Sequence, residues 1–124
     1  MQLSHFTELT VYPKAVELTA QMFCPLKALA SRGALFPDRQ IRRAARSVGA
    51  NIPEAWGKRR HQAHFVCKLT DADGGNHEVE PWLITARGAG YPTAEEFNDC
   101  REQKREVGRM LGSLIQNPGP FLLK

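Results

Sequence analysis

Apolar residues recur along this chain at steps of three and four, which is the spacing of one face of an α-helix. The pattern predicts four helices and a short C-terminal tail, over residues 5–31, 38–57, 61–88, 93–116 and 118–124. No segment alternates apolar and polar residues as a half-buried strand would. Because short connections join the helices, we expect an all-α protein in which residues 1–117 form one antiparallel up-down-up-down four-helix bundle.

Each predicted helix carries one apolar stripe that should face the core of the bundle. The first stripe has a proline, Pro13, at one of its positions. In chain order, the stripes consist of Phe6, Leu9, Val16, Ala20 and Phe23; of Ile41, Ala44, Ala45, Val48, Ile52, Ala55 and Trp56; of Phe65, Leu69, Ala72, Val79, Leu83 and Ala86; and of Phe97, Cys100, Val107, Met110 or Leu111, and Leu114.

Four prolines fall inside these segments, and each removes a backbone hydrogen bond if it lies in a helix interior. We therefore expect kinks or interruptions at Pro13, Pro25 and Pro53, and a local weakening of the third helix at Pro81.

Other residues predict where the helices begin and end. Asp38 is a plausible N-cap of the second helix, and Thr93 with Glu96 three residues later has the pattern of a capping box for the fourth. The first helix should end near Gly33, and the third should end at the run Gly88–Gly90.

The composition is that of one ordinary globular domain, with 124 residues, 42% of them hydrophobic and 24% charged. The N-terminus lacks the features of a secretory signal, and no apolar run approaches the roughly 18 residues of a membrane helix. Three widely spaced cysteines, Cys24, Cys67 and Cys100, indicate free thiols in a reducing compartment. We expect a soluble, cytoplasmic protein.

The positive charge of the chain is concentrated in one place. The formal net charge is +4, and residues 37–60 contain seven Lys or Arg against two Asp or Glu. Four arginines of the second helix fall within an arc of about 100°, on the side opposite its apolar stripe. The candidate nucleic-acid-binding residues are Arg39, Arg42, Arg43, Arg46, Lys58, Arg59 and Arg60. Guanidinium groups match phosphate oxygens, so this basic stripe predicts contacts to RNA or DNA phosphates.

The same arginines have a structural interpretation. Asp71, Asp73, Glu78 and Glu80 flank the apolar stripe of the third helix, and they could pair with the arginines within one subunit or between subunits. Both interpretations stay open at this point, and both can hold together.

Several polar residues are weaker candidates for chemistry. His61, His64 and Cys67 are spaced by three residues. At this spacing successive side chains turn around the helix surface, so they do not converge on one metal ion. A carboxylate pair of Glu54 with Glu78 or Glu80 could serve acid–base catalysis. Polar packing or interface contacts are the better interpretation for Asn51, Glu54, Glu78 and Glu80.

A cysteine nucleophile would need an activating base, and Cys100 lies on an apolar stripe where a buried structural thiol is expected. Trp56 and Trp82 could stack on bases, but core or subunit-interface packing is favoured. We therefore expect no metal, no cofactor and no enzyme active site. A small enzyme with a site between subunits is kept as the weakest alternative.

The second helix carries a sequence motif that resembles one in a known protein family. The segment from Gln40 to Ala55 resembles the Q-[IL]-x-R-A-x-x-S-[IV]-x-x-N-I-A-E-G pattern of the 23S rRNA intervening-sequence proteins, also called the four helix bundle protein family. The matching residues are Gln40, Ile41, Arg43, Ala44, Ser47, Val48, Asn51, Ile52 and Glu54. Weaker similarity extends over roughly residues 6 to 115. Pro53 stands where the family has alanine, and Ala55-Trp56 replaces its glycine turn.

The resemblance implies a four-helix bundle that assembles as a ring-like homopentamer. Some members of the family are encoded inside insertions in large-subunit ribosomal RNA genes. A related branch, the accessory variability determinant of diversity-generating retroelements, binds a reverse transcriptase and nucleic acid, whereas most members have no established activity. We therefore predict a non-enzymatic homo-oligomeric binding protein that contacts RNA or DNA and could also bind a protein partner. The alternative is a structural or protein-interaction module whose arginines form inter-subunit salt bridges.

Overall fold

The computed structural model describes residues 3–31, 35–90 and 92–123, with side chains described outside residues 22–38. Within those ranges the chain forms helices and no strand. The elements are the 3₁₀ turn η1 (Phe6–Glu8), the helices α1 (Val11–Ser31), α2 (Leu35–Gly57), α3 (Gln62–Gly88) and α4 (Ala94–Gln116), and the 3₁₀ turn η2 (Gly119–Phe121).

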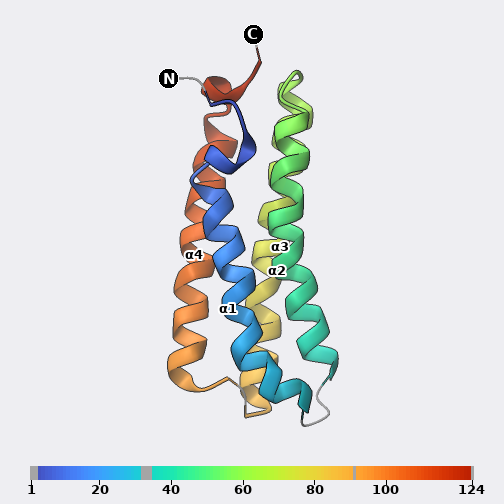
Figure 1. The fold of residues 1–124 in the computed structure, drawn as a ribbon, viewed down its shortest axis with the longest axis vertical. Coiled ribbons are helices and arrows are strands. Elements are labelled where there is room, and N and C mark those ends of the chain that lie inside the picture. Colours follow the sequence, from blue (N-terminus) through green and yellow to red (C-terminus); the bar gives the residue numbers. More distant parts are fainter. Residues whose placement is uncertain (1–2, 32–34, 91, 124) are drawn as a thin grey trace.

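The four helices lie side by side, and each runs antiparallel to the one before it (Figure 1). Each helix packs on its neighbour in sequence, and α1 also packs on α4, which closes the bundle. The two ends of the described chain lie at the same end of the bundle (Figure 1). The all-α four-helix fold predicted from the apolar periodicity is therefore confirmed. No helix in the described ranges has an apolar stretch that could cross a membrane.

The core confirms the stripes predicted for the last three helices. Every predicted stripe residue of α3 is buried, and in α4 the choice between Met110 and Leu111 falls to Leu111. Trp56 and Phe97 are half-buried and pack against the core from its edge. The buried stripe residues are Ile41, Ala44, Ala45, Val48, Ile52 and Ala55 in α2, Phe65, Leu69, Ala72, Val79, Leu83 and Ala86 in α3, and Cys100, Val107, Leu111 and Leu114 in α4.

Of the stripe predicted for the first helix, Leu9 is buried as expected, but the part within the helix is wrong. Val16 is 48% exposed and Ala20 is exposed, whereas Val11, Ala15 and Leu18 are buried. The helix begins at Val11 and not at residue 5, because the preceding residues form the separate turn η1. A stripe continued from η1 into α1 therefore combined two segments that do not share a helical phase. Phe23 lies outside the described side chains.

A local hydrogen-bond network separates η1 from α1. The His5 ring caps the turn by accepting from the Thr7 backbone N–H at 3.4 Å, and the Ser4 hydroxyl donates to the Glu8 carboxylate at 2.6 Å. These bonds with Ser4 lower the pKa of Glu8. Pro13 then occupies the first turn of α1, where its missing N–H has no intrahelical partner to lose.

None of the four prolines interrupts its helix. Pro53 lies inside α2, Pro81 lies inside α3, and Pro25 falls within the bounds of α1. An interior proline costs a helix about 3 kcal/mol in isolation. In α2 and α3 the buried residues on both sides of the proline pack into the core, so tertiary contacts offset that cost.

Some of the predicted helix starts and ends are confirmed, and one is wrong. The capping box is confirmed, because Thr93 Oγ1 accepts from Glu96 N at 3.2 Å and Thr93 N donates to the Glu96 carboxylate at 3.0 Å. Helix α3 ends at Gly88, and Gly90 adopts a φ of +96°, as expected of a glycine after a helix. The N-cap prediction for Asp38 is wrong, since α2 begins at Leu35 and its first turn accommodates Pro37. Gly33 lies outside the described residues.

Candidate nucleic-acid interface

The packing of α2 decides where its arginines lie. Ile41, Ala44 and Val48 are buried on the inner face of the helix, so Arg39 and Arg46 project from its outer side and are exposed. Neither of these two arginines forms an ion pair within the described part of the chain. Arg42 is half-buried and has an interaction partner. The outer side of α2 therefore presents two guanidinium groups, about two helical turns apart, to solvent.

The third exposed arginine of the stripe is tied to α3. Arg43 forms an ion pair with the Glu78 carboxylate, and its Nε donates to Gln40 Oε1 at 3.0 Å. Glu78 also accepts from the indole N–H of Trp82 at 3.4 Å. Both ion-paired side chains are largely exposed, so the pair adds little stability and mainly orients Arg43.

The turn after α2 uses Arg59 as a structural residue. Its guanidinium carbon lies 3.5 Å from the centroid of the Trp56 ring, and its Nε donates to the Trp56 carbonyl at 2.8 Å. Partial burial lowers the pKa of Arg59. The Arg59 carbonyl accepts from Leu123 N at 3.2 Å, which joins the C-terminal tail to this turn. Lys58 and Arg60 stay exposed on either side.

Glu54, Glu78 and Glu80, the glutamates considered for an acid–base pair, each face a separate cation. Glu54 lies 3.1 Å from Lys68 Nζ, an interaction that raises the pKa of Lys68, and Glu80 lies 3.6 Å from Arg101 Nε. Glu78 belongs to the Arg43 pair described above. Because each carboxylate faces a cation and not another carboxylate, this arrangement is that of polar packing between helices and not of a carboxylate pair.

Asn51, the remaining polar candidate, makes a local contact within α2. Its Nδ2 donates to the Ser47 carbonyl at 2.8 Å, one turn earlier in the same helix. The asparagine of the family-like motif therefore bonds to the backbone of its own helix.

The histidine and cysteine candidates do not converge. The rings of His61 and His64 meet edge to face with centroids 5.2 Å apart, and Cys67 is exposed one turn further along. Within the described ranges, no three His, Cys, Asp or Glu side chains are placed to hold a metal ion. Cys100 is buried, and its burial raises the pKa of the thiol to about 11, so it is protonated near neutral pH.

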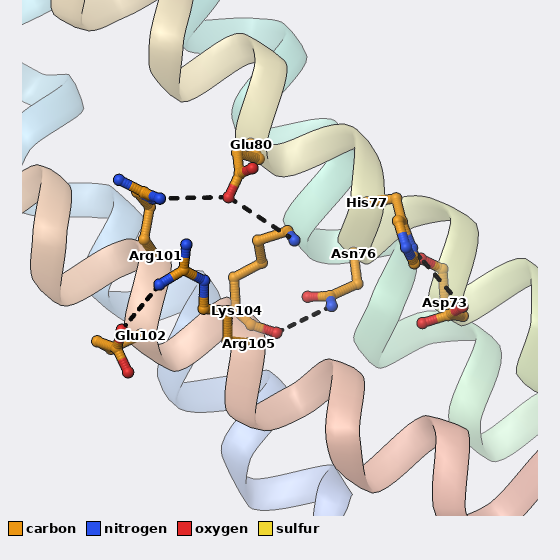
Figure 2. A network of polar contacts seen from close by, with 8 residues as sticks. All are labelled: Asp73, Asn76, His77, Glu80, Arg101, Glu102, Lys104 and Arg105. Atoms are coloured by element: carbon orange, nitrogen blue, oxygen red, sulfur yellow. Dashed lines mark hydrogen bonds and ion pairs between the residues drawn. The ribbon is translucent and has the colours of Figure 1, made fainter.

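Sequence reasoning missed a second basic surface, on α4. Arg101, Arg105 and Arg109 are spaced by four residues and therefore line one side of the helix, with Lys104 beside them. The neighbouring acidic residues of α4 cancel this charge in a simple count, which concealed it. The i, i+4 spacing of the basic residues is the signal that could have found it. Figure 2 shows Arg101, Lys104 and Arg105 on α4 together with Asn76, a residue of α3 that no periodicity argument selected.

The fold therefore places this chain in the class of small all-helical bundle proteins, with basic side chains exposed on the second helix. The family model for the 23S rRNA-intervening sequence protein matches residues 7–113, and the chain belongs to that family. A crystal structure of a protein of unknown function from the S23 ribosomal protein family of Bacteroides thetaiotaomicron is similar to this chain. It shares 28% sequence identity over 87% of this chain and 100% of the other, with a TM-score of 0.79. None of the curated proteins compared with the chain matches it.

Proposed function

We propose that this protein is a non-enzymatic, oligomeric, cytoplasmic binding protein whose α2 arginines contact the phosphates of RNA or DNA. The observation that carries the proposal is the exposure of Arg39 and Arg46 on the outer side of α2, with no ion pair in the described part of the chain. Exposed guanidinium groups spaced along one helix suit the repeated charges of a nucleic-acid backbone. Lys58 and Arg60 extend the same charge past the end of the helix.

Membership of a family named for an insertion in 23S rRNA supports RNA as the first ligand to test. Self-association is part of the proposal, with a homopentamer as the form that the family resemblance implies. A ring would repeat the α2 arginines in every subunit, so weak contacts of each subunit would add up along one nucleic acid.

The second candidate is a structural or protein-interaction module in which arginines pair with carboxylates of a neighbouring subunit. The Arg43–Glu78 ion pair favours it, because it demonstrates within one chain the kind of α2–α3 pairing that an interface would need. In that case the arginines would support the oligomer instead of a nucleic acid.

Reversing the two exposed charges, Arg39→Glu with Arg46→Glu, separates these functions. Fluorescence anisotropy with a structured RNA that carries a 5′-hydroxyl, and with single-stranded DNA, would be measured across a salt series, with light scattering for the oligomer. Nucleic-acid contact predicts binding that the reversal weakens by about tenfold or more at moderate salt, with a shallower salt dependence and an unchanged oligomer. The matched control is Arg105→Glu with Arg109→Glu on α4.

Loss of the oligomer on reversal of Arg39 and Arg46, with no RNA or DNA binding by the wild-type protein at low salt, would reject nucleic-acid contact in favour of the structural module. Equal loss of RNA binding in the α4 control would show general charge attraction and would contradict a specific role of α2.

A further inference from the structure

A hollow of about 380 Å³ opens between α3 and α4, away from the outer side of α2. Figure 2 shows five of its lining side chains, Asp73, Asn76 and His77 from α3 and Lys104 and Arg105 from α4. It is lined by Asp73, Asn76, His77, Lys104, Arg105, Gly108 and Arg109. Three of these residues are cations and a single one, Asp73, is a carboxylate, so the hollow favours an anion.

The three cations are only partly neutralised by the protein. Arg109 is exposed and forms no ion pair within the ranges that the structure describes. Arg105 pairs with Glu102 at 3.1 Å on the solvent side, and Lys104 Nζ lies 4.0 Å from a Glu80 oxygen that Arg101 also approaches. Arg105 and Arg109 are one helical turn apart, where like charges repel unless an anion lies between them.

The carboxylate on the rim has a partner of its own. Asp73 Oδ2 lies 3.6 Å from the Nδ1 of His77, and the same ring nitrogen contacts the Asp73 carbonyl at 2.8 Å. Figure 2 shows both residues on the α3 side, with the cations across from them on α4. The cationic wall therefore belongs to α4, and an anion bound there would approach Arg105 and Arg109 first.

The floor of the hollow contains an unsatisfied acceptor. Asn76 is 1% exposed, and its Nδ2 donates to the Lys104 carbonyl at 2.9 Å, which fixes the orientation of the amide. Its Oδ1 accepts no hydrogen bond within the described part of the chain. Such a buried acceptor is costly unless water or a ligand supplies a donor.

The backbone across from Asn76 keeps this floor tight. A Cβ built on Gly108 would stand 3.1 Å from Asn76 Nδ2, tighter than nine in ten real Cβ contacts, so a side chain at position 108 would press on the amide. Glycine therefore lets α4 approach Asn76 and leaves the space beside it open.

We propose that this hollow binds a phosphomonoester. Cations gathered around one compact space suit a single group with nearly two charges, whereas the row on α2 suits a chain of singly charged phosphodiesters. Arg105, Arg109 and Lys104 contact the phosphate oxygens, and Asn76 lies beneath them at the floor of the hollow. The proposal rests on α3 and α4 alone and stands whether or not α2 binds nucleic acid.

The phosphomonoester could come from a free nucleotide or from the 5′ end of a nucleic acid. The test is an NMR titration of the full-length protein with adenosine 5′-monophosphate, with adenosine as the uncharged control. Two RNAs of identical sequence, with a 5′-phosphate or a 5′-hydroxyl, separate the two sources. The proposal expects shifts of the backbone amides of residues 73–77 and 104–109 with the monophosphate and not with adenosine.

Variants assign the effect to the hollow. Arg105→Ala with Arg109→Ala should weaken binding of the monophosphate about tenfold or more, and the matched pair Arg39→Ala with Arg46→Ala should leave it unchanged. Asn76→Asp places a negative charge on the floor and should also abolish binding, with the fold checked by circular dichroism. Preference for 5′-phosphorylated RNA over the free nucleotide would place the ligand at a nucleic-acid end, and the reverse would indicate a small molecule.

Either preference supports the site. Equal shifts with adenosine, no shift at millimolar monophosphate, or full binding by the Arg105→Ala/Arg109→Ala variant would overturn it. The α2 variants are tested with RNA that carries a 5′-hydroxyl and therefore has no 5′-phosphomonoester. Absence of a phosphomonoester site would leave that RNA binding unchanged, and absence of an α2 interface would leave binding of the monophosphate unchanged.

Discussion

Gly75 of α3 lies directly against Ser47 of α2. A Cβ built at Gly75 would stand 2.1 Å from Ser47 Oγ and 3.1 Å from the Ala44 carbonyl oxygen. Ser47 Oγ donates to that same carbonyl at 2.7 Å, so the hydroxyl is held in place and cannot easily turn away. This close approach of the two helices therefore depends on a residue without a side chain, although glycine weakens an isolated helix.

Gly75→Ala should destabilise the protein by about 1–3 kcal/mol, because the added methyl forces α3 away from α2. The neighbouring glycine provides a matched control, since nothing lies within 4 Å of a Cβ built at Gly74. Gly74→Ala should be neutral or stabilise by up to about 1 kcal/mol, because alanine is the better helix former. Urea denaturation of both variants gives the two free energies of unfolding. Equal effects of the two substitutions would contradict the close contact at Gly75.

Thr93→Ala should lower the free energy of unfolding by about 0.5–2 kcal/mol, because it removes the side-chain oxygen that accepts from Glu96 N. Thr85 is the control, since it is a helical threonine whose hydroxyl donates to the Pro81 carbonyl at an exposed position. Thr85→Ala should change stability by less than about 0.5 kcal/mol. Thermal unfolding followed by circular dichroism would measure both, and an unchanged stability of Thr93→Ala would remove the capping box as a stabilising feature.

Arg59→Ala should destabilise the turn after α2 by about 1 kcal/mol, because it loses both the stacking on Trp56 and the hydrogen bond to the Trp56 carbonyl. Lys58→Ala removes the same charge from an exposed neighbour and should have almost no effect on stability. Chemical denaturation compares the two, with Trp56 fluorescence reporting on the stack. If Lys58→Ala proved as costly as Arg59→Ala, net charge and not the stack would be responsible.

Cys100 should react with thiol reagents far more slowly than Cys67 at pH 8, measured in a Cys24→Ser background. Cys67 is exposed, whereas Cys100 is buried with a thiol pKa of about 11. The raised pKa also predicts a pH dependence of stability. Between the ordinary value of 9.0 and about 11 the unfolded chain loses this proton and the folded chain keeps it, so stability falls as the pH rises through that range.

A Cys100→Ala variant isolates that effect. It should unfold more readily at neutral pH, since it leaves a cavity in the core, but it should lose less additional stability between pH 9 and 11 than the parent protein. An identical pH dependence of the two proteins would show that other groups are responsible.

The sequence by itself determined the fold class, three of the four core stripes and the capping box at Thr93. These features depend on residues within one or two helical turns of each other, and periodicity reads that spacing directly. The motif around Ser47 and Asn51 also identified the family, which the match over residues 7–113 confirms.

The tertiary structure corrected the rest, beginning with α1. Whether Phe6 and Leu9 continue into the stripe of the next helix depends on where that helix begins, and the bonds of His5 and Ser4 that hold the separate turn η1 are not visible as periodicity. Pro53 was expected to bend or interrupt its helix and Pro81 to weaken its helix, because a local rule assigns each proline a cost that only burial of its neighbours offsets.

The candidate sites depended most on how the helices pack against one another. The pairing of Arg43 with Glu78, the contact of Gly75 with Ser47 and the hydrogen bond from Asn76 to the Lys104 carbonyl each join residues from different helices. A sequence specifies which face of a helix is apolar, but the axial offset and rotation of one helix against the next come from how the side chains of both helices fit together. Only that packing decides which charge on one helix meets which group on another.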